Sequence, residues 1–246
     1  MQMSEHLSSI GTFFFRWRGY LFLFLCPIIL LSFMGFSYRI GSPTFEFLWE
    51  VGCFLISLLG LSVRVLTVGT VPRGTSGRST KSPRADVLNT TGMYSTVRHP
   101  LYLGNYLMAL GISLFPRSWA LPIILSLAFI LHYERVIWEE EKYLESKFGD
   151  KFRAWATKVP IIIPRFRNYQ PPGLSFCWKA ALKREFYGLF GITVAFLNLD
   201  IFGDLIVYER IQFDLIWMAL FVMGLIFFLI MEILKKKTGL LRVNGR

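Results

Sequence analysis

The sequence predicts an all-α polytopic membrane protein with about six transmembrane helices, two of which form a short helical hairpin. Of the 246 residues, 54% are hydrophobic and 17% are aromatic, and the mean hydropathy is positive. This composition is too apolar for an ordinary soluble domain. The three cysteines lack the paired spacing of a metal site, so no metal is expected.

Two apolar runs predict an N-terminal two-helix membrane segment, residues 1–70. The first run, residues 20–37, follows Arg16 and Arg18 and resembles the apolar region of a signal peptide. It is long enough to span a bilayer and lacks a small-residue cleavage site, so we interpret it as an uncleaved helix. The second run covers residues 47–69.

Residues 101–115 and the run that follows them predict a tight helical hairpin. The first arm would measure about 22 Å at 1.5 Å per residue, which is less than the ~30 Å hydrocarbon core. Residues 116–118 contain a proline and break the helix, and the second arm runs back to Tyr133 or Trp138. The free ends of a hairpin meet at one membrane face. The Arg-His-Pro step at residues 98–100 and the acidic run at residues 139–141 are therefore expected to lie together.

Apolar side chains recur at helical spacing among basic residues beyond the acidic run, at Leu144, Phe148, Phe152 and Trp155. This pattern predicts an amphipathic helix, interrupted at Gly149, that lies on the membrane surface or caps the hairpin. Residues 159–164 are bounded by prolines and predict an extended apolar lid. With the preceding loop, these segments form a central domain, residues 71–168.

The remaining apolar runs, residues 187–207 and 211–234, predict a C-terminal two-helix segment, residues 169–246. With both termini on one side, 22 of the 27 Lys and Arg residues lie on that side, and the other side holds only Arg39, Arg117 and Arg210. By the positive-inside rule, both termini and the face with the Arg-His-Pro step are cytoplasmic. The same asymmetry explains the net charge of +11 without a nucleic-acid partner.

Residues 98–100 and 139–141 have complementary chemistry. Pro100 suits the first position of a helix, and the free N–H groups and positive charge at that entry favour an anion. The acidic run supplies carboxylates for hydroxyl or ammonium groups. A ligand that carries both kinds of group is expected between them.

The loop before this step has features of a phosphate site. Two glycines, Gly74 and Gly77, allow the backbone N–H groups to turn inward, and Arg73 and Arg78 flank them with planar guanidinium groups. Ser76 adds a hydroxyl group. The alternative is a solvated cytoplasmic loop that follows the positive-inside rule.

An ordered set of motifs across residues 86–165 resembles the C-terminal core of the isoprenylcysteine carboxyl methyltransferase and phospholipid methyltransferase superfamily. The motifs are Gly92-Met93-Tyr94, Arg98-His99-Pro100-Leu101-Tyr102-Leu103-Gly104, Glu140-Glu141, Leu144, Phe148-Gly149 and the Val159-Pro160…Pro164 ending. The resemblance implies an integral membrane methyltransferase that uses S-adenosylmethionine at a site on the cytoplasmic face.

The resemblance also implies which residues form the site. The implied cofactor contacts are Asp86, Val87, Leu88, Asn89, Gly92, Tyr94, His99, Pro100, Leu101, Tyr102, Glu140 and Glu141. Arg98 and His99 are the catalytic candidates, and Glu139 is interpreted as a solvated surface charge. His99 has the alternative role of a helix cap.

The loop at residues 74–78 further resembles bacterial relatives that methylate the phosphate of lipid A. This implies O-methylation of a membrane lipid in the bacterial cytoplasmic membrane, with Arg73, Ser76, Arg78 and Arg135 as substrate-binding candidates. The chain differs from the prenylcysteine enzymes in having two spans after the core and Val136 where they have an arginine that holds substrate. Arg135 is adjacent to that position.

The chemistry of the acceptor leaves alternatives. Transfer of a methyl group from a sulfonium to an anionic oxygen cancels charge, so a water-poor site and correct positioning are enough. An amine acceptor needs a base, for which His99 or a glutamate is the candidate. The alternatives are therefore a phospholipid amine N-methyltransferase or a prenylcysteine carboxyl methyltransferase.

Two further alternatives belong to other classes. Sterol-type membrane reductases that use NADPH end in a similar Arg-His-Pro segment, but they place Asn where this chain has Leu101. A non-enzymatic lipid-binding membrane protein is the other. The sequence leaves the lipid and the oligomeric state open.

Overall fold

The computed structural model describes residues 43–72, 74–75, 85–211, 213–243 and 245 of the chain. The first predicted span, residues 20–37, lies outside this part, as do Arg73, Ser76, Gly77 and Arg78. Within the described residues the fold is all-helical, and the one β-type pairing is an isolated bridge between Gly92 and Gln170. The predicted all-α fold is confirmed for these residues.

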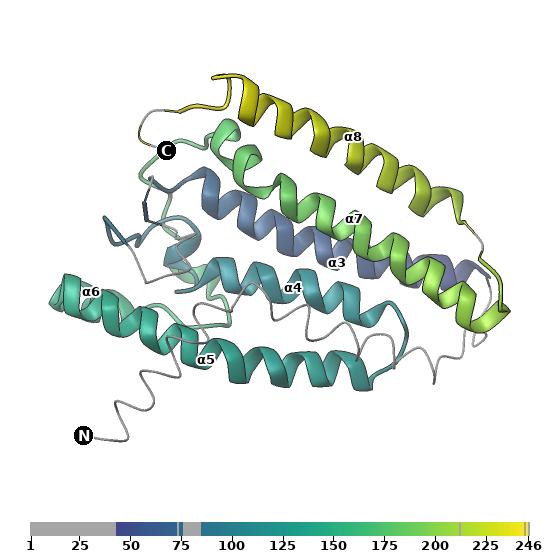
Figure 1. The fold of residues 1–246 in the computed structure, drawn as a ribbon. Helices are drawn as coiled ribbons and strands as arrows, with labels where there is room; N and C mark the ends of the chain where they lie inside the picture. The colour runs from purple at the N-terminus through teal and green to yellow at the C-terminus, as the bar shows by residue number, and fades with distance from the viewer. Residues whose placement is uncertain (1–42, 73, 76–84, 212, 244, 246) are drawn as a thin grey trace.

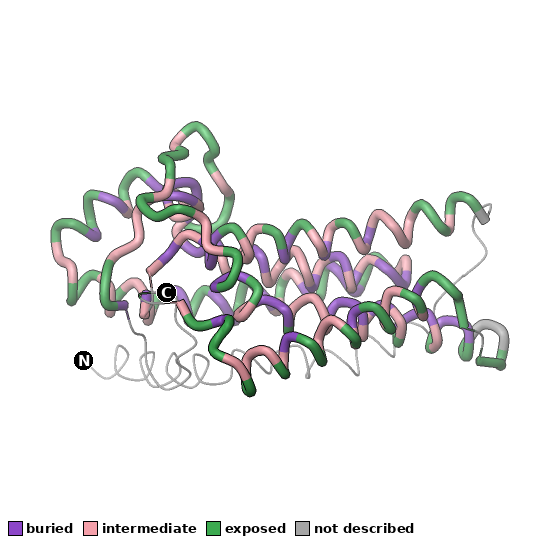
Figure 2. The backbone as a smooth tube through the Cα atoms, turned by 90° about the horizontal axis from the view of Figure 1, so that it is seen from above, coloured by how far each residue is buried: buried purple, intermediate pink, exposed green. Residues whose placement is uncertain are grey.

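Five long helices lie side by side in the order α8, α7, α3, α4 and α5 (Figure 1). They are α3 (Pro43–Gly69), α4 (Pro100–Leu114), α5 (Ala120–Phe148), α7 (Trp178–Tyr208) and α8 (Leu215–Lys237). Within the described part, α3, α5, α7 and α8 are long and apolar enough to cross a membrane. Buried and exposed residues alternate along the helices (Figure 2), and many exposed side chains are large and apolar. The protein is therefore an integral membrane protein.

Small residues bring α3 and α4 into close contact. A Cβ atom on Gly60 would lie 2.5 Å from the carbonyl oxygen of Gly104. The Ser57 hydroxyl donates a hydrogen bond of 2.9 Å to the Met108 carbonyl. Close backbone approach at small residues is the usual way in which helices associate in lipid. It fixes α4, which begins at the Arg-His-Pro step, against a membrane-spanning helix.

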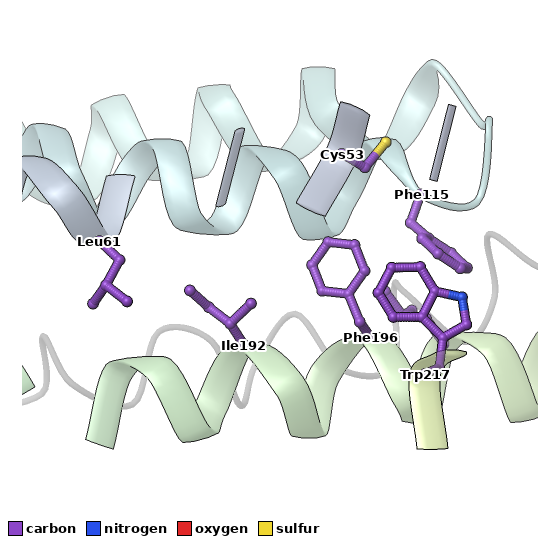
Figure 3. Close-up of a cluster of buried hydrophobic side chains, with 7 residues drawn as sticks. Cys53, Leu61, Phe115, Ile192, Phe196 and Trp217 are labelled. Atoms are coloured by element: carbon purple, nitrogen blue, oxygen red, sulfur yellow. The ribbon is translucent and has the colours of Figure 1, made fainter. Parts of the chain in front are cut away.

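An aromatic cluster holds the other end of this assembly. Phe115, just after α4, packs edge-on against Phe196 of α7 and Trp217 of α8, with ring centroids 5.5 and 5.9 Å away. Figure 3 shows these rings near Cys53, with Ile192 and Leu61 further along the same buried cluster. Edge-to-face aromatic contacts add to the gain from burial. The bundle is thus anchored at the end of α4 remote from His99.

The predicted hairpin is present, with α4 ending at Leu114 and α5 beginning at Ala120. The prediction that the returning arm stops before the acidic run is wrong, because α5 continues to Phe148. Residues 139–148 contain neither Gly nor Pro, so nothing ends the helix until Gly149, whose φ of 53° is left-handed.

The short helix α6 (Asp150–Ala156) follows Gly149 directly. Its Phe152 and Trp155 form a buried cluster with Val159, against which Leu144 and Phe148 of α5 pack. The predicted amphipathic spacing and the interruption at Gly149 therefore both occur. Residues 159–164 form no helix, and Ile161, Ile162 and Ile163 are exposed.

Helix α7 begins at Trp178, well before the predicted start at residue 187. Four charged residues interrupt the apolar pattern of residues 178–186, but Lys, Ala, Leu, Arg and Glu are good helix formers. Hydropathy alone therefore placed the start of this helix too late.

Candidate active site

The Arg-His-Pro step is held between the hairpin and residues 159–170. His99 is the residue before α4, and Pro100 occupies the first helical turn. The backbone N–H of Arg98 donates to the Pro160 carbonyl at 2.8 Å, and that of Arg165 donates to the Thr96 carbonyl at 2.9 Å. These bonds fix the backbone on which the charged side chains of the step are mounted.

The Arg-His-Pro step and the acidic run meet directly. Arg98 Nη1 donates to both carboxylate oxygens of Glu141, at 2.8 and 2.9 Å. His99 Nε2 lies 3.0 Å from Glu141, and His99 Nδ1 lies 3.5 Å from Glu140. The Tyr102 hydroxyl donates to Glu140 at 2.9 Å. The topological prediction that the two hairpin ends meet is therefore correct.

The carboxylates of Glu140 and Glu141 determine the protonation of the buried His99 ring. Burial alone would lower its pKa, but the hydrogen bonds and charges of Glu140 and Glu141 outweigh burial, so the pKa is raised above its usual value. Near neutral pH the ring is consequently more protonated than a free imidazole. A protonated His99 between two carboxylates holds the cluster together electrostatically.

A first cavity opens beside this cluster. Its lining includes eight of the predicted cofactor residues: Val87, Leu88, Asn89, Tyr94, His99, Leu101, Tyr102 and Glu140. The catalytic candidate Arg98 also lines it. Burial raises the pKa of the Tyr94 phenol, which therefore stays neutral.

Four predicted cofactor residues do not line the first cavity: Asp86, Gly92, Pro100 and Glu141. Gly92 shapes the backbone instead, with a φ of 62° and a hydrogen bond from its N–H to the Gln170 carbonyl. The Asp86 N–H donates to the Gly74 carbonyl at 3.2 Å, and a Cβ on Gly74 would meet the Asp86 carboxylate. These residues shape or support the walls of the cavity.

A second cavity, of about 660 Å³, shares the lining residues His99 and Tyr102 with the first. Its wall is largely apolar and includes Phe129, Ile130, Tyr133, Ile161 and Ile162. The predicted substrate residue Arg135 lines it too, as does Glu141. The two neighbouring glutamates therefore face different cavities.

Several lining residues were not predicted as site residues: Thr75, Tyr143 and Trp155 in the first cavity, and Tyr106, Tyr133 and Glu134 in the second. The helical spacing of Trp155 with Phe148 and Phe152 predicts that its side chain is buried, but it does not predict that this side chain lines a cavity. Thr75 places the described part of the glycine loop beside the first cavity.

The environment of Glu139 differs from that of the solvated surface charge that the sequence predicts. Its Oε1 atom is excluded from solvent, and no hydrogen bond to that atom is found within the described part of the chain. Among the described residues, no group of three His, Cys, Asp or Glu side chains is arranged to hold a metal.

The chain is similar in sequence to several known proteins. The phospholipid methyltransferase family model matches residues 73–151. The cobalt-zinc-cadmium resistance protein CzcN of Cupriavidus metallidurans is 30% identical over 181 residues, which cover 72% of this chain and 81% of the relative.

Two further relatives match over shorter lengths. The nickel-cobalt-cadmium resistance protein NccN of Alcaligenes xylosoxydans xylosoxydans is 32% identical over 122 residues, or 50% of this chain and 57% of the relative. The protein-S-isoprenylcysteine O-methyltransferase of Schizosaccharomyces pombe is 35% identical over 86 residues. This match covers 35% of this chain and 36% of the relative. No solved structure matches the chain significantly.

Proposed function

Because the chain belongs to the phospholipid methyltransferase and isoprenylcysteine carboxyl methyltransferase superfamily of membrane proteins, we propose that it methylates an anionic headgroup oxygen of a membrane lipid with S-adenosylmethionine. In this proposal residues 71–168 are the methyltransferase core, flanked by two-helix segments at 1–70 and 169–246. The site faces the cytoplasm from the bacterial inner membrane, in keeping with the distribution of Lys and Arg.

The chemistry of the first cavity suits this cofactor. Glu140 offers a carboxylate for hydroxyl or ammonium groups, and Arg98 provides positive charge near the helix entry for a carboxylate. Leu88 and Trp155 supply apolar and aromatic surface for an adenine ring. The residues therefore fit a zwitterionic ligand with a planar base.

The second cavity suits a lipid acceptor. It is about 660 Å³, largely apolar and bordered by exposed isoleucines of the 159–164 segment. Arg135 supplies the positive charge that an anionic headgroup requires. Because His99 and Tyr102 line both cavities, donor and acceptor would meet beside these two side chains.

The environment of His99 is the single observation that favours an anionic acceptor over an amine. S-adenosylmethionine supplies a methyl group on a sulfonium, and its transfer to an anionic oxygen breaks the S–CH₃ bond and forms an O–CH₃ bond without releasing a proton. An amine acceptor would need a base that is unprotonated at the working pH. His99 is poorly suited to that role, because its pKa is raised and both ring nitrogens face carboxylates. The glutamates are poorly suited as well, because Glu140 is held by Tyr102 and Glu141 by Arg98.

We favour a lipid phosphate such as that of lipid A, because the sequence of the loop at residues 74–78 combines two glycines, two hydroxyl side chains and an arginine, which suit a phosphate group. The names of two relatives refer to divalent-metal resistance. Methylation of a phosphate removes a negative charge that attracts such cations. The second candidate acceptor is a prenylcysteine carboxylate, which the name of the fission yeast relative favours.

Methyl transfer from radiolabelled S-adenosylmethionine to a defined lipid panel tests the proposal. The purified protein, in lipid nanodiscs, is offered lipid A, phosphatidic acid, phosphatidylethanolamine and a prenylcysteine. Label on a phosphate or carboxylate supports the proposal. Label on the amine contradicts the anionic acceptor, and binding of NADPH without binding of S-adenosylmethionine would identify a reductase instead.

A further inference from the structure

A buried polar network joins α7 to the active-site helices, although α7 lies beyond the family match at residues 73–151. Glu185 of α7 has 4% side-chain exposure and forms a two-pronged ion pair with Arg64 of α3. Arg64 Nε lies 2.6 Å from Glu185 Oε2, and Nη2 lies 3.0 Å from Oε1. Such fork-to-fork pairs fix orientation as well as charge.

Arg64 extends this network into the hairpin. Its Nη1 donates to Asn105 Oδ1 of α4 at 2.6 Å, and Asn105 Nδ2 donates to the Tyr133 hydroxyl of α5 at 3.2 Å. Arginine can only donate, so the Asn105 atom that faces it must be the carbonyl oxygen. Arg64 thereby determines that Asn105 presents its NH₂ group to Tyr133.

Tyr133 transmits this constraint to the candidate site. Its ring lies 4.5 Å from that of Tyr102, and the Tyr102 hydroxyl donates to Glu140. Tyr133 lines the second cavity, whereas Tyr102 lines both. The network therefore ends on side chains that line the two cavities.

Gly104 of the sequence motif makes room for this network. A Cβ atom at residue 104 would lie 2.5 Å from Arg64 Cγ and 2.7 Å from the Gly60 carbonyl oxygen. Arg64 therefore reaches Asn105 across the side of α4 where residue 104 has no side chain.

We propose that Arg64 and Glu185 are positioning residues for methyl transfer, acting through Asn105 and Tyr133 on Tyr102 and Glu140. This inference rests on the proposed function. Stability alone is a weak reason for such a pair, because apolar residues of similar volume often replace a buried ion pair without loss. Correct placement of the reacting groups, in contrast, affects turnover strongly.

The test compares Glu185→Gln, Arg64→Lys and the double variant Arg64→Leu/Glu185→Leu. In all three variants kcat should fall about tenfold, while the affinity for S-adenosylhomocysteine should change by less than about twofold. The double variant should keep the wild-type melting temperature, whereas Glu185→Gln should lower it, because it leaves the charge of Arg64 without its partner. Arg64→Lys should retain more activity than the double variant, because lysine keeps the charge and can donate to Asn105. Glu232→Gln on α8 is the matched control, since Glu232 pairs with Lys236 and Tyr187 outside this network. It should leave kcat unchanged.

A second readout does not depend on activity. With fluorotyrosine incorporated, Glu185→Gln should shift the ¹⁹F resonance of Tyr133 and leave that of Tyr169, which is outside the network, in place. An unshifted Tyr133 resonance, or wild-type kcat in the double variant, overturns the inference. A shifted Tyr133 resonance in a protein that methylates no lipid supports the structural coupling and contradicts only the proposed function.

Discussion

Substitution of Glu140 by glutamine tests the first cavity most directly. Glu140 lines this cavity, accepts a hydrogen bond from Tyr102 at 2.9 Å and lies 3.5 Å from His99. Glutamine keeps an acceptor for Tyr102 but removes the charge. A hydrogen bond to a charged group contributes about 1.5–3 kcal/mol, against about 0.5–1.5 kcal/mol for a neutral pair. The midpoints of these ranges differ by about 1.2 kcal/mol, which corresponds to about eightfold weaker binding of S-adenosylmethionine.

The assay is calorimetry on the protein in nanodiscs, with the melting temperature measured in parallel. Glu139→Gln is the matched control, because residue 139 is adjacent on α5 but lines neither cavity. It should leave the affinity unchanged. The reasoning is refuted if Glu140→Gln binds the cofactor as the wild type does, or if both variants weaken binding equally.

Three further predictions address protonation, helix packing and the acceptor. The pKa of His99 is raised in the folded protein, so its contribution to stability is complete below about pH 6.5 and is lost as the pH rises through the folded pKa. The melting temperature should therefore fall over that range, and His99→Gln should flatten the profile. Gly60→Ala should destabilise the protein by about 1–3 kcal/mol in a denaturation assay, because the new Cβ meets the Gly104 carbonyl, whereas Gly52→Ala has open space and should not destabilise it. Arg78→Lys should lower turnover on a lipid phosphate much more than cofactor binding, because lysine lacks the planar fork; equal turnover in a radiolabel assay would identify that loop as a basic tether.

Two parts of the site could be predicted from the sequence because the interactions involved are local or periodic. A short apolar run broken at residues 116–118 predicts a hairpin, and a hairpin returns its ends to one face. The contact between Arg98 and Glu141 follows from this topology. The break at Gly149 follows from the backbone freedom of glycine, which has a left-handed φ there.

The continuation of α5 was not predicted, because hydropathy reports where a helix leaves the membrane rather than where it ends. Glu139 to Phe148 form a helix whose apolar side packs on α6. The same limitation placed the start of α7 too late and left Glu185 outside any predicted helix.

By itself, the sequence determined the membrane class, the all-helical fold, the hairpin and the meeting of its two charged ends, since hydrophobic length and helix breaks act locally along the chain. Only the tertiary structure decided that His99 and Tyr102 line two cavities, that Glu140 and Glu141 line different ones, and that Arg64 links Glu185 to Asn105. These features depend on the rotation and spacing of packed helices. The close approach of α3 and α4 at Gly60 and Gly104 sets this rotation and spacing. The residue spacing within a single helix does not encode such an approach between two helices.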